Sequence, residues 1–176
     1  MKLPLDLSKI VTSPHDLLTI MIDAYRNREK INDNVEFARA IINANPLVLN
    51  DDDVVIELPT EYEGTESEKE TKSSLLLHLL KPFINENGSH PIHWASYMGL
   101  HEMVNLLCSF NKQHYFDHTF GSSLAMKKTK TEQKIPLCYA RDKKTMDALI
   151  QSHISTPTIK ELSSSSEFLS SATLYI

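Results

Sequence analysis

The sequence predicts an all-α protein built from paired helices. Apolar residues recur at helical spacing in several segments, and Ser-Pro, Asn-Pro and glycine signals start or end most of them. The predicted helices are short and come in pairs, as in proteins whose units stack side by side. Of the 176 residues, 41% are apolar and 23% are charged, a balance typical of a chain that folds around a core. The length is sufficient for one ordinary domain.

The first predicted pair covers residues 14–49. Ser13 and Pro14 form a helix start, with the serine as N-cap and the proline at the first helical position. Asp33 or Asn34 is predicted to cap the second helix, which an Asn-Pro sequence then ends. We interpret this pair as an irregular terminal unit that caps a stack.

An acidic segment, residues 51–72, interrupts the pattern. It holds nine acidic residues against two lysines, and its only apolar run is 54–56. We interpret it as a solvated, mobile insertion, with 54–56 as a short strand or hairpin arm. A further helix is predicted from about Ser73 to Phe83, with Pro82 bending or ending it.

The most specific pattern lies in residues 88–108. Pro91 can begin a short helix, and Gly99 can end it because glycine takes left-handed backbone without a Cβ clash. Glu102 lies in the first turn of a second helix, where its charge suits the helix dipole. The apolar face of that helix comprises Met103, Leu106 and Leu107. Two such short helices cannot bury their apolar faces alone and need similar pairs beside them.

This segment resembles the ankyrin repeat, whose motif runs Gly-x-Thr-Pro-Leu-His-x-Ala-Ala-x-x-Gly-His-x-Glu-Ile-Val-x-x-Leu-Leu. The chain matches the motif at Gly88, Pro91, His93, Ala95, Gly99, Glu102, Val104, Leu106 and Leu107. It departs from the motif at His90, Ile92, Ser96, Leu100 and Met103. The resemblance assigns one clear repeat to residues 86–110 and implies a short, irregular ankyrin-like stack with long insertions.

A worn second copy is assigned to residues 131–151. Its first helix matches the motif at Pro136, Leu137 and Ala140, whereas Cys138 and Arg141 replace the histidine and the second alanine, and the turn glycine is missing. Residues 111–134 form a second insertion, in which four lysines stand against one acid between 127 and 134. Residues 1–154 are therefore assigned to one domain and 155–176 to a Ser-rich tail.

For the histidines and cysteines, structural roles are favoured over metal binding or catalysis. His90, His93, His101 and Cys108 are residue types that bind zinc, but the resemblance gives His93 a structural role with hydrogen bonds to the backbone. Cys108 and Cys138 occupy positions expected to be packed and reduced, which disfavours a reactive thiol. No phosphate-binding or nucleophile motif occurs. We therefore assign no catalytic residue, no metal ligand and no cofactor, and we expect no enzymatic activity.

The resemblance implies protein–protein recognition, in which a partner meets the turn tips and the exposed side of the first helices. Tyr97 and Met98 are then either exposed contacts or half-buried packing. Lysines between 127 and 134 add a basic surface for an acidic partner surface, an anionic lipid or the acidic segment itself. The candidate partner-binding residues are Glu86, Asn87, Ser89, Tyr97, Met98, Lys127, Lys128, Lys130, Thr131, Glu132, Lys134, Asp142 and Lys143.

Composition indicates which classes of partner and which cellular compartment to expect. A net charge of −5, and lysines without interleaved aromatic residues, disfavour nucleic-acid binding. No apolar run is long enough to span a membrane or to act as a Sec-type signal. We expect an intracellular, cytoplasmic protein that is monomeric alone and binds a protein partner. The low glycine content and Ser-rich tail are similar to those of effectors that intracellular bacteria deliver into host cells by a non-Sec route. The alternatives are an enzyme with its active site in the insertions and an endogenous adaptor or scaffold.

Overall fold

A computed structural model describes residues 13–49, 51, 53–57, 65–114 and 124–154. Every regular element in these ranges is helical, which confirms the all-α prediction. The α-helices are α1 (Pro14–Arg26), α2 (Ile31–Ala44), α3 (Glu66–Leu80), α4 (Pro91–Tyr97), α5 (His101–His114) and α6 (Lys143–Ile154). Single 3-10 turns are η2 (Arg28–Lys30), η3 (Pro46–Leu49), η4 (Leu124–Met126) and η5 (Pro136–Tyr139). The Ser-rich tail lies outside the described residues.

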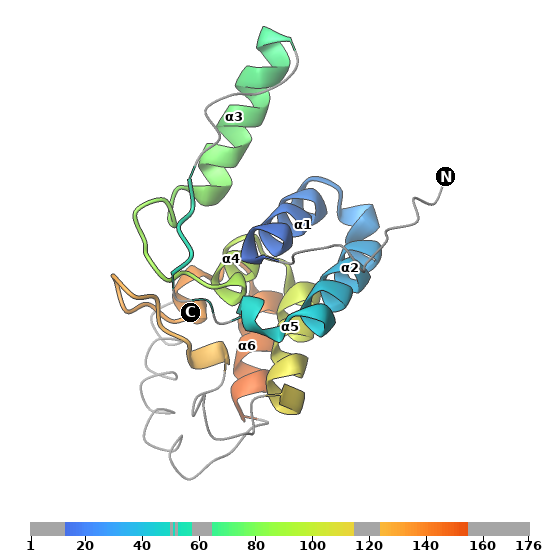
Figure 1. Cartoon of the computed structure of the whole chain (residues 1–176), viewed down its shortest axis with the longest axis vertical. Coiled ribbons are helices and arrows are strands. Elements are labelled where there is room, and N and C mark those ends of the chain that lie inside the picture. Colours follow the sequence, from blue (N-terminus) through green and yellow to red (C-terminus); the bar gives the residue numbers. More distant parts are fainter. Residues whose placement is uncertain (1–12, 50, 52, 58–64, 115–123, 155–176) are drawn as a thin grey trace.

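The helices lie in two layers, each with one element from each of three successive units (Figure 1). In the inner layer α1 contacts α4, and α4 contacts η5. In the outer layer α2 contacts α5, and α5 contacts α6. Within the units α1 pairs with α2, α4 with α5, and η5 with α6. The described elements therefore form three pairs in contact with one another, although the first helix of the third pair is only a 3-10 turn.

The first pair begins as predicted but continues differently. The Asp16 carboxylate accepts a hydrogen bond from the Ser13 N–H at 2.7 Å, and Pro14 is the first helical residue. The prediction that Asp33 or Asn34 caps the second helix is wrong, because the chain turns through η2 and enters α2 at Ile31. Asn34 lies inside α2 and is buried, and its amide donates to Asp23 of α1 at 3.2 Å.

The acidic segment is partly helical, because residues 66–72 belong to α3. Its interpretation as a mobile insertion stays a prediction. Thr65 and Glu68 form a reciprocal capping box, in which the Thr65 N–H donates to the Glu68 carboxylate at 2.9 Å. Such a cap satisfies free N–H groups of the first turn and starts α3 earlier than the predicted Ser73. Val54 and Ile56 are buried and Val55 is exposed, but residues 53–57 form no strand.

Helix α3 extends away from the two layers (Figure 1). It ends at Leu80, two residues before Pro82, as predicted. Its C-terminal half contacts the core: Leu79 and Leu80 are buried, and Leu75 and Leu76 pack against the core while partly exposed, whereas Leu77 is 46% exposed. The C-terminal end of α3 therefore fixes the helix to the inner layer.

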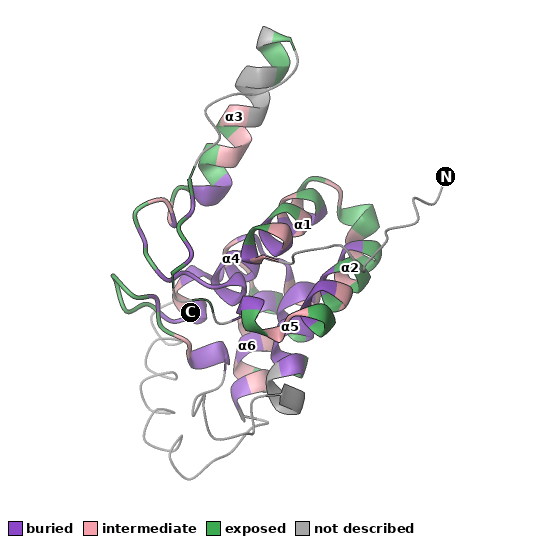
Figure 2. Cartoon of the chain, viewed as in Figure 1, coloured by how far each residue is buried: buried purple, intermediate pink, exposed green. Residues whose placement is uncertain are grey.

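The core lies between the layers (Figure 2) and includes Trp94 of α4, which is fully buried. The Trp94 indole N–H donates to the Ser89 hydroxyl at 2.9 Å, so the one polar atom of this large side chain is satisfied. The same buried cluster contains residues from all three pairs, including Leu17, Met21, Ile42, Phe83, Leu100, Leu107, Leu137 and Leu149. Trp94 therefore belongs to the hydrophobic core.

The third pair departs from the predicted helix because its turn has no glycine. Gly99 joins α4 to α5 with a φ of +65°, whereas the chain leaves η5 at Ala140 through extended backbone. The Asp142 carboxylate then starts α6 by accepting the Thr145 N–H at 2.8 Å. The worn copy at 131–151 thus retains its second helix and reduces its first to one turn.

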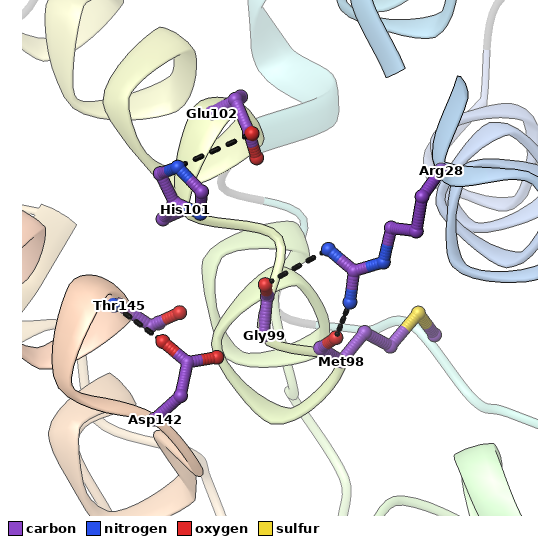
Figure 3. Close-up of polar contacts among 7 residues, drawn as sticks. All are labelled: Arg28, Met98, Gly99, His101, Glu102, Asp142 and Thr145. Atoms are coloured by element: carbon purple, nitrogen blue, oxygen red, sulfur yellow. Dashed lines mark hydrogen bonds and ion pairs between the residues drawn. The ribbon is translucent and has the colours of Figure 1, made fainter. Parts of the chain in front are cut away.

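The turns of the three pairs lie next to one another (Figure 3). The Arg28 guanidinium donates to the Met98 carbonyl at 2.9 Å and to the Gly99 carbonyl at 3.1 Å. On the other side of Gly99 lies the Asp142 carboxylate, which a Cβ on residue 99 would meet. A cation from the first pair and an anion from the third therefore enclose the turn of the second.

Gly99→Ala is expected to lower the free energy of unfolding by about 2 kcal/mol. Alanine at positive φ costs about 1–2 kcal/mol, and the new methyl group displaces the Asp142 carboxylate from its cap. Urea titration of Gly99→Ala, Asp142→Ala and the double variant measures this coupling. Strictly additive losses would show that residue 99 and the Asp142 carboxylate do not contact each other.

Candidate interaction surface

Two turns at one end of the inner layer are joined by hydrogen bonds, and we call residues 86–89 and 129–134 the turn pair. One oxygen of the Glu86 carboxylate accepts the N–H groups of Thr131 and Glu132, both at 2.9 Å. The Asn87 carbonyl accepts the Lys130 N–H at 2.9 Å. Because these bonds involve backbone groups of the second turn, they fix its position relative to the first.

The second turn is also closed on itself. The Thr129 N–H donates to the Lys134 carbonyl at 3.0 Å, and the Lys134 N–H donates to the Thr129 hydroxyl at 3.1 Å. The Gln133 amide donates to the Thr129 and Lys130 carbonyls. Ion pairing with Glu132 raises the pKa of Lys134. These bonds give the second turn a defined conformation.

One ion pair joins the basic turn to the acidic segment, as the opposite charges of the two segments suggested. The Lys130 ammonium lies 3.4 Å from the Asp53 carboxylate, and both side chains are exposed. An exposed pair of this kind contributes only about 0–1 kcal/mol. The position of the turn pair therefore depends on Glu86 and the backbone more than on this contact.

His93 is hydrogen-bonded to backbone groups of residues that flank the turn pair. Its Nδ1 accepts the His90 N–H at 2.9 Å, so its Nε2 carries the proton and donates to the Lys127 carbonyl at 2.9 Å. Burial, and secondarily the neighbouring His90, lower the pKa of His93 to about 3. The ring is therefore neutral at physiological pH, and the predicted buried, backbone-bonded His93 is confirmed. Burial also raises the pKa of the nearby Tyr139 phenol.

A second group of contacting side chains lies farther along the inner layer, and we call His78, Phe83, Tyr97 and Arg141 the Arg141 cluster; His78 and Arg141 are exposed, Tyr97 is partly exposed and Phe83 is buried. The Arg141 guanidinium carbon lies 3.8 Å from the centre of the Tyr97 ring, and the guanidinium donates to the Tyr97 hydroxyl. Another guanidinium nitrogen lies 3.4 Å from His78 Nε2. The buried Phe83 ring contacts Tyr97 edge-on, with centroids 5.6 Å apart. The cluster joins α3, α4 and the residues after η5.

Ten of the thirteen predicted partner-binding residues retain exposed surface. Tyr97 is half-buried against Phe83 and Arg141, which is the second of the two readings proposed for it. The exposed residues are Asn87, Lys128, Lys130, Thr131, Glu132, Lys134 and Lys143, and the partly exposed residues are Tyr97, Lys127 and Asp142.

Glu86, Ser89 and Met98 are buried, and the prediction that they contact a partner is wrong. Glu86 binds the backbone of the second turn, and Ser89 accepts the Trp94 indole proton. Met98 points into the core and is 2% exposed. Sequence position within a turn did not reveal these inward orientations, because they depend on the neighbouring unit.

Two residues of the surface, Arg141 and His78, were missed by sequence reasoning. Arg141 occupies a position where the ankyrin motif has a small alanine, and this exchange was the available signal. His78 gave no signal, because its contact with Arg141 bridges 63 sequence positions.

The described part of the chain was compared with the arrangements that metal binding and thiol chemistry need. No group of three or more His, Cys, Asp or Glu side chains there is placed to hold a metal ion. Cys108 is buried and Cys138 is partly exposed, and neither is disulfide-bonded, so the predicted packing holds fully only for Cys108. Among the described helices, none has the length and apolar character needed to cross a membrane.

No family model, curated protein or solved structure matches the chain. The ankyrin-like interpretation therefore depends on the motif residues and on the arrangement of the three pairs.

Glu86→Ala is expected to lower the free energy of unfolding by about 2 kcal/mol, because it removes two charge-assisted hydrogen bonds to the next turn. The amides of Thr131 and Glu132 should then exchange with solvent faster, which NMR measures. Glu132→Ala is the matched control, since its carboxylate is exposed. Equal exchange rates in Glu86→Ala and the wild type would contradict the bridging role of Glu86.

Proposed function

We propose that the chain is a protein-interaction module of the ankyrin type, which binds a partner protein through its inner layer. The observation that carries the proposal is the turn pair: exposed polar and charged side chains stand on turns that are held by backbone hydrogen bonds. A surface ordered before binding loses less conformational entropy when a partner docks.

Three further observations support this proposal. The motif residues of the clear repeat serve the structural tasks that the resemblance implies, with His93 bonded to the backbone and Gly99 at positive φ. The three pairs stack in order along the chain. The two ionisable groups with the largest pKa shifts, His93 and Tyr139, are buried between elements, which favours structural over catalytic roles.

On composition alone, we also propose in which cell the protein acts. The low glycine content and Ser-rich tail favour an effector that a bacterium delivers into host cells. An endogenous adaptor is the alternative. Capture of a specific protein from a eukaryotic lysate and not from a bacterial lysate would support the effector, and the reverse result would support the adaptor.

Affinity capture with matched variants tests the function. Changing Lys130 and Lys134, the two lysines of the turn pair, to serine should weaken capture of the specific partner, and raising salt from about 50 to about 300 mM should weaken wild-type capture. The matched control changes two exposed cations outside the turn pair, Arg39 and Lys144, to serine. If both variants capture the partner equally poorly, the weakening depends only on net charge, which would contradict recognition through the turn pair.

A further inference from the structure

We infer that Arg141 is the specificity-determining contact for an acidic segment of the partner protein, which it binds through a carboxylate. This inference deepens the proposed function and rests on it. The starting observation is an exposed guanidinium held in one orientation by its neighbours. Tyr97 supports it by stacking and through its hydroxyl, and His78 supports it from α3.

The supports of Arg141 are themselves fixed. The Tyr97 hydroxyl donates to the His78 carbonyl at 3.4 Å, and the Tyr97 ring packs edge-on against the fully buried Phe83. Phe83 in turn contacts Tyr139, with centroids 5.2 Å apart. Because neighbouring side chains already hold the Arg141 guanidinium, it loses little conformational freedom when it binds a ligand. This pre-organisation favours specific recognition of a planar anion.

Arg141 also has binding capacity left. A guanidinium carries five N–H groups, and the structure uses two of its nitrogens, one for Tyr97 and one for His78. Within the described part of the chain, no carboxylate pairs with Arg141, although the side chain is exposed. The geometry thus leaves donors for the two oxygens of an incoming carboxylate, which pairs with arginine in a two-pronged arrangement.

The positive charge around Arg141 also favours an acidic segment as its partner. Residues 127–144 contain seven lysines and arginines against Glu132 and Asp142, whereas the whole chain has a net charge of −5. Both acids are already engaged, Glu132 with Lys134 and Asp142 with the Thr145 N–H. Residues 127–144 therefore form a local basic segment on an acidic protein. An acidic segment is attracted there and repelled elsewhere, which fixes where it docks.

The test selects random twelve-residue peptides, displayed on phage, for binding to the full chain. Enriched peptides should be rich in Asp and Glu. Arg141→Gln and Arg141→Lys should each weaken their binding about tenfold, because an ammonium neither stacks nor forms the two-pronged contact. Tyr97→Phe, which keeps the ring and removes the hydroxyl, should weaken it a few-fold. Lys144→Gln removes the same charge from an exposed neighbouring site and should change binding less than threefold.

Several outcomes would overturn the inference. These are equal losses in Arg141→Gln and Lys144→Gln, enrichment of neutral peptides, no enrichment at all, or tighter binding after a serine in the peptide is phosphorylated. Neutral peptides whose binding depends on Lys130 and not on Arg141 would overturn the role of Arg141 while supporting the proposed interaction module. The proposed function itself fails only if protein capture is also independent of the turn pair.

Discussion

Trp94→Ala is expected to lower the free energy of unfolding by about 3–5 kcal/mol, the largest effect of any single substitution considered. The indole is fully buried in the core, and its removal leaves a cavity there and deprives the Ser89 hydroxyl of its partner. Urea titration followed by far-ultraviolet circular dichroism measures the loss, since Trp94 is the only tryptophan and its fluorescence disappears with it.

Trp94→Phe separates volume from hydrogen bonding. It keeps most of the apolar contact and removes only the N–H donor to Ser89, so its loss should be about 1–2 kcal/mol. If Trp94→Ala lowers stability by less than 1 kcal/mol, the helix register that buries this ring is incorrect.

Acidification is expected to lower the stability of the protein through His93. Burial lowers its folded-state pKa to about 3, whereas the unfolded chain has the ordinary value of 6.5. Between these values the unfolded state binds the extra proton, so stability rises with pH and falls as the pH is lowered from 6.5 towards 3. The loss between pH 7.5 and pH 5 should be about 2 kcal/mol from this group alone.

His93→Gln identifies the source of the pH dependence. The variant should be less stable at pH 7.5, because the bonds to His90 and Lys127 are weakened, yet lose less additional stability at pH 5 than the wild type. Urea titration of both proteins at the two pH values gives the comparison. Parallel losses in the two proteins would assign the pH dependence to other groups.

The elements that sequence reasoning located correctly are those with local signals. Ser13-Pro14, Gly99 and Pro82 each determine backbone conformation within a few residues, and the structure begins or ends helices there. The motif also identified the structural role of His93, which is buried. The start of α3 was missed, although Thr65 and Glu68 carried a readable capping signal, because the acidic charge of the segment was given more weight.

The surface could be predicted only in part, because side-chain direction depends on the neighbouring unit. Glu86 is in a turn, but it points to backbone N–H groups 45 and 46 residues later. Arg141 reaches Tyr97 and His78 across similar separations. Pairings of this length have no local pattern, so the sequence indicated the turn tips but not which side chains face outward.

Site-specific photo-cross-linking tests the central claim that the inner layer binds a partner. A cross-linking amino acid is placed at the exposed Asn87 or Lys130 of the turn pair, or at the exposed Asn105 or Asp147 of the outer layer, in the full chain. After irradiation in eukaryotic lysate, we predict discrete adducts of one size from the two turn-pair positions and none from the outer-layer positions. Adducts formed equally or preferentially at Asn105 and Asp147 would contradict the account.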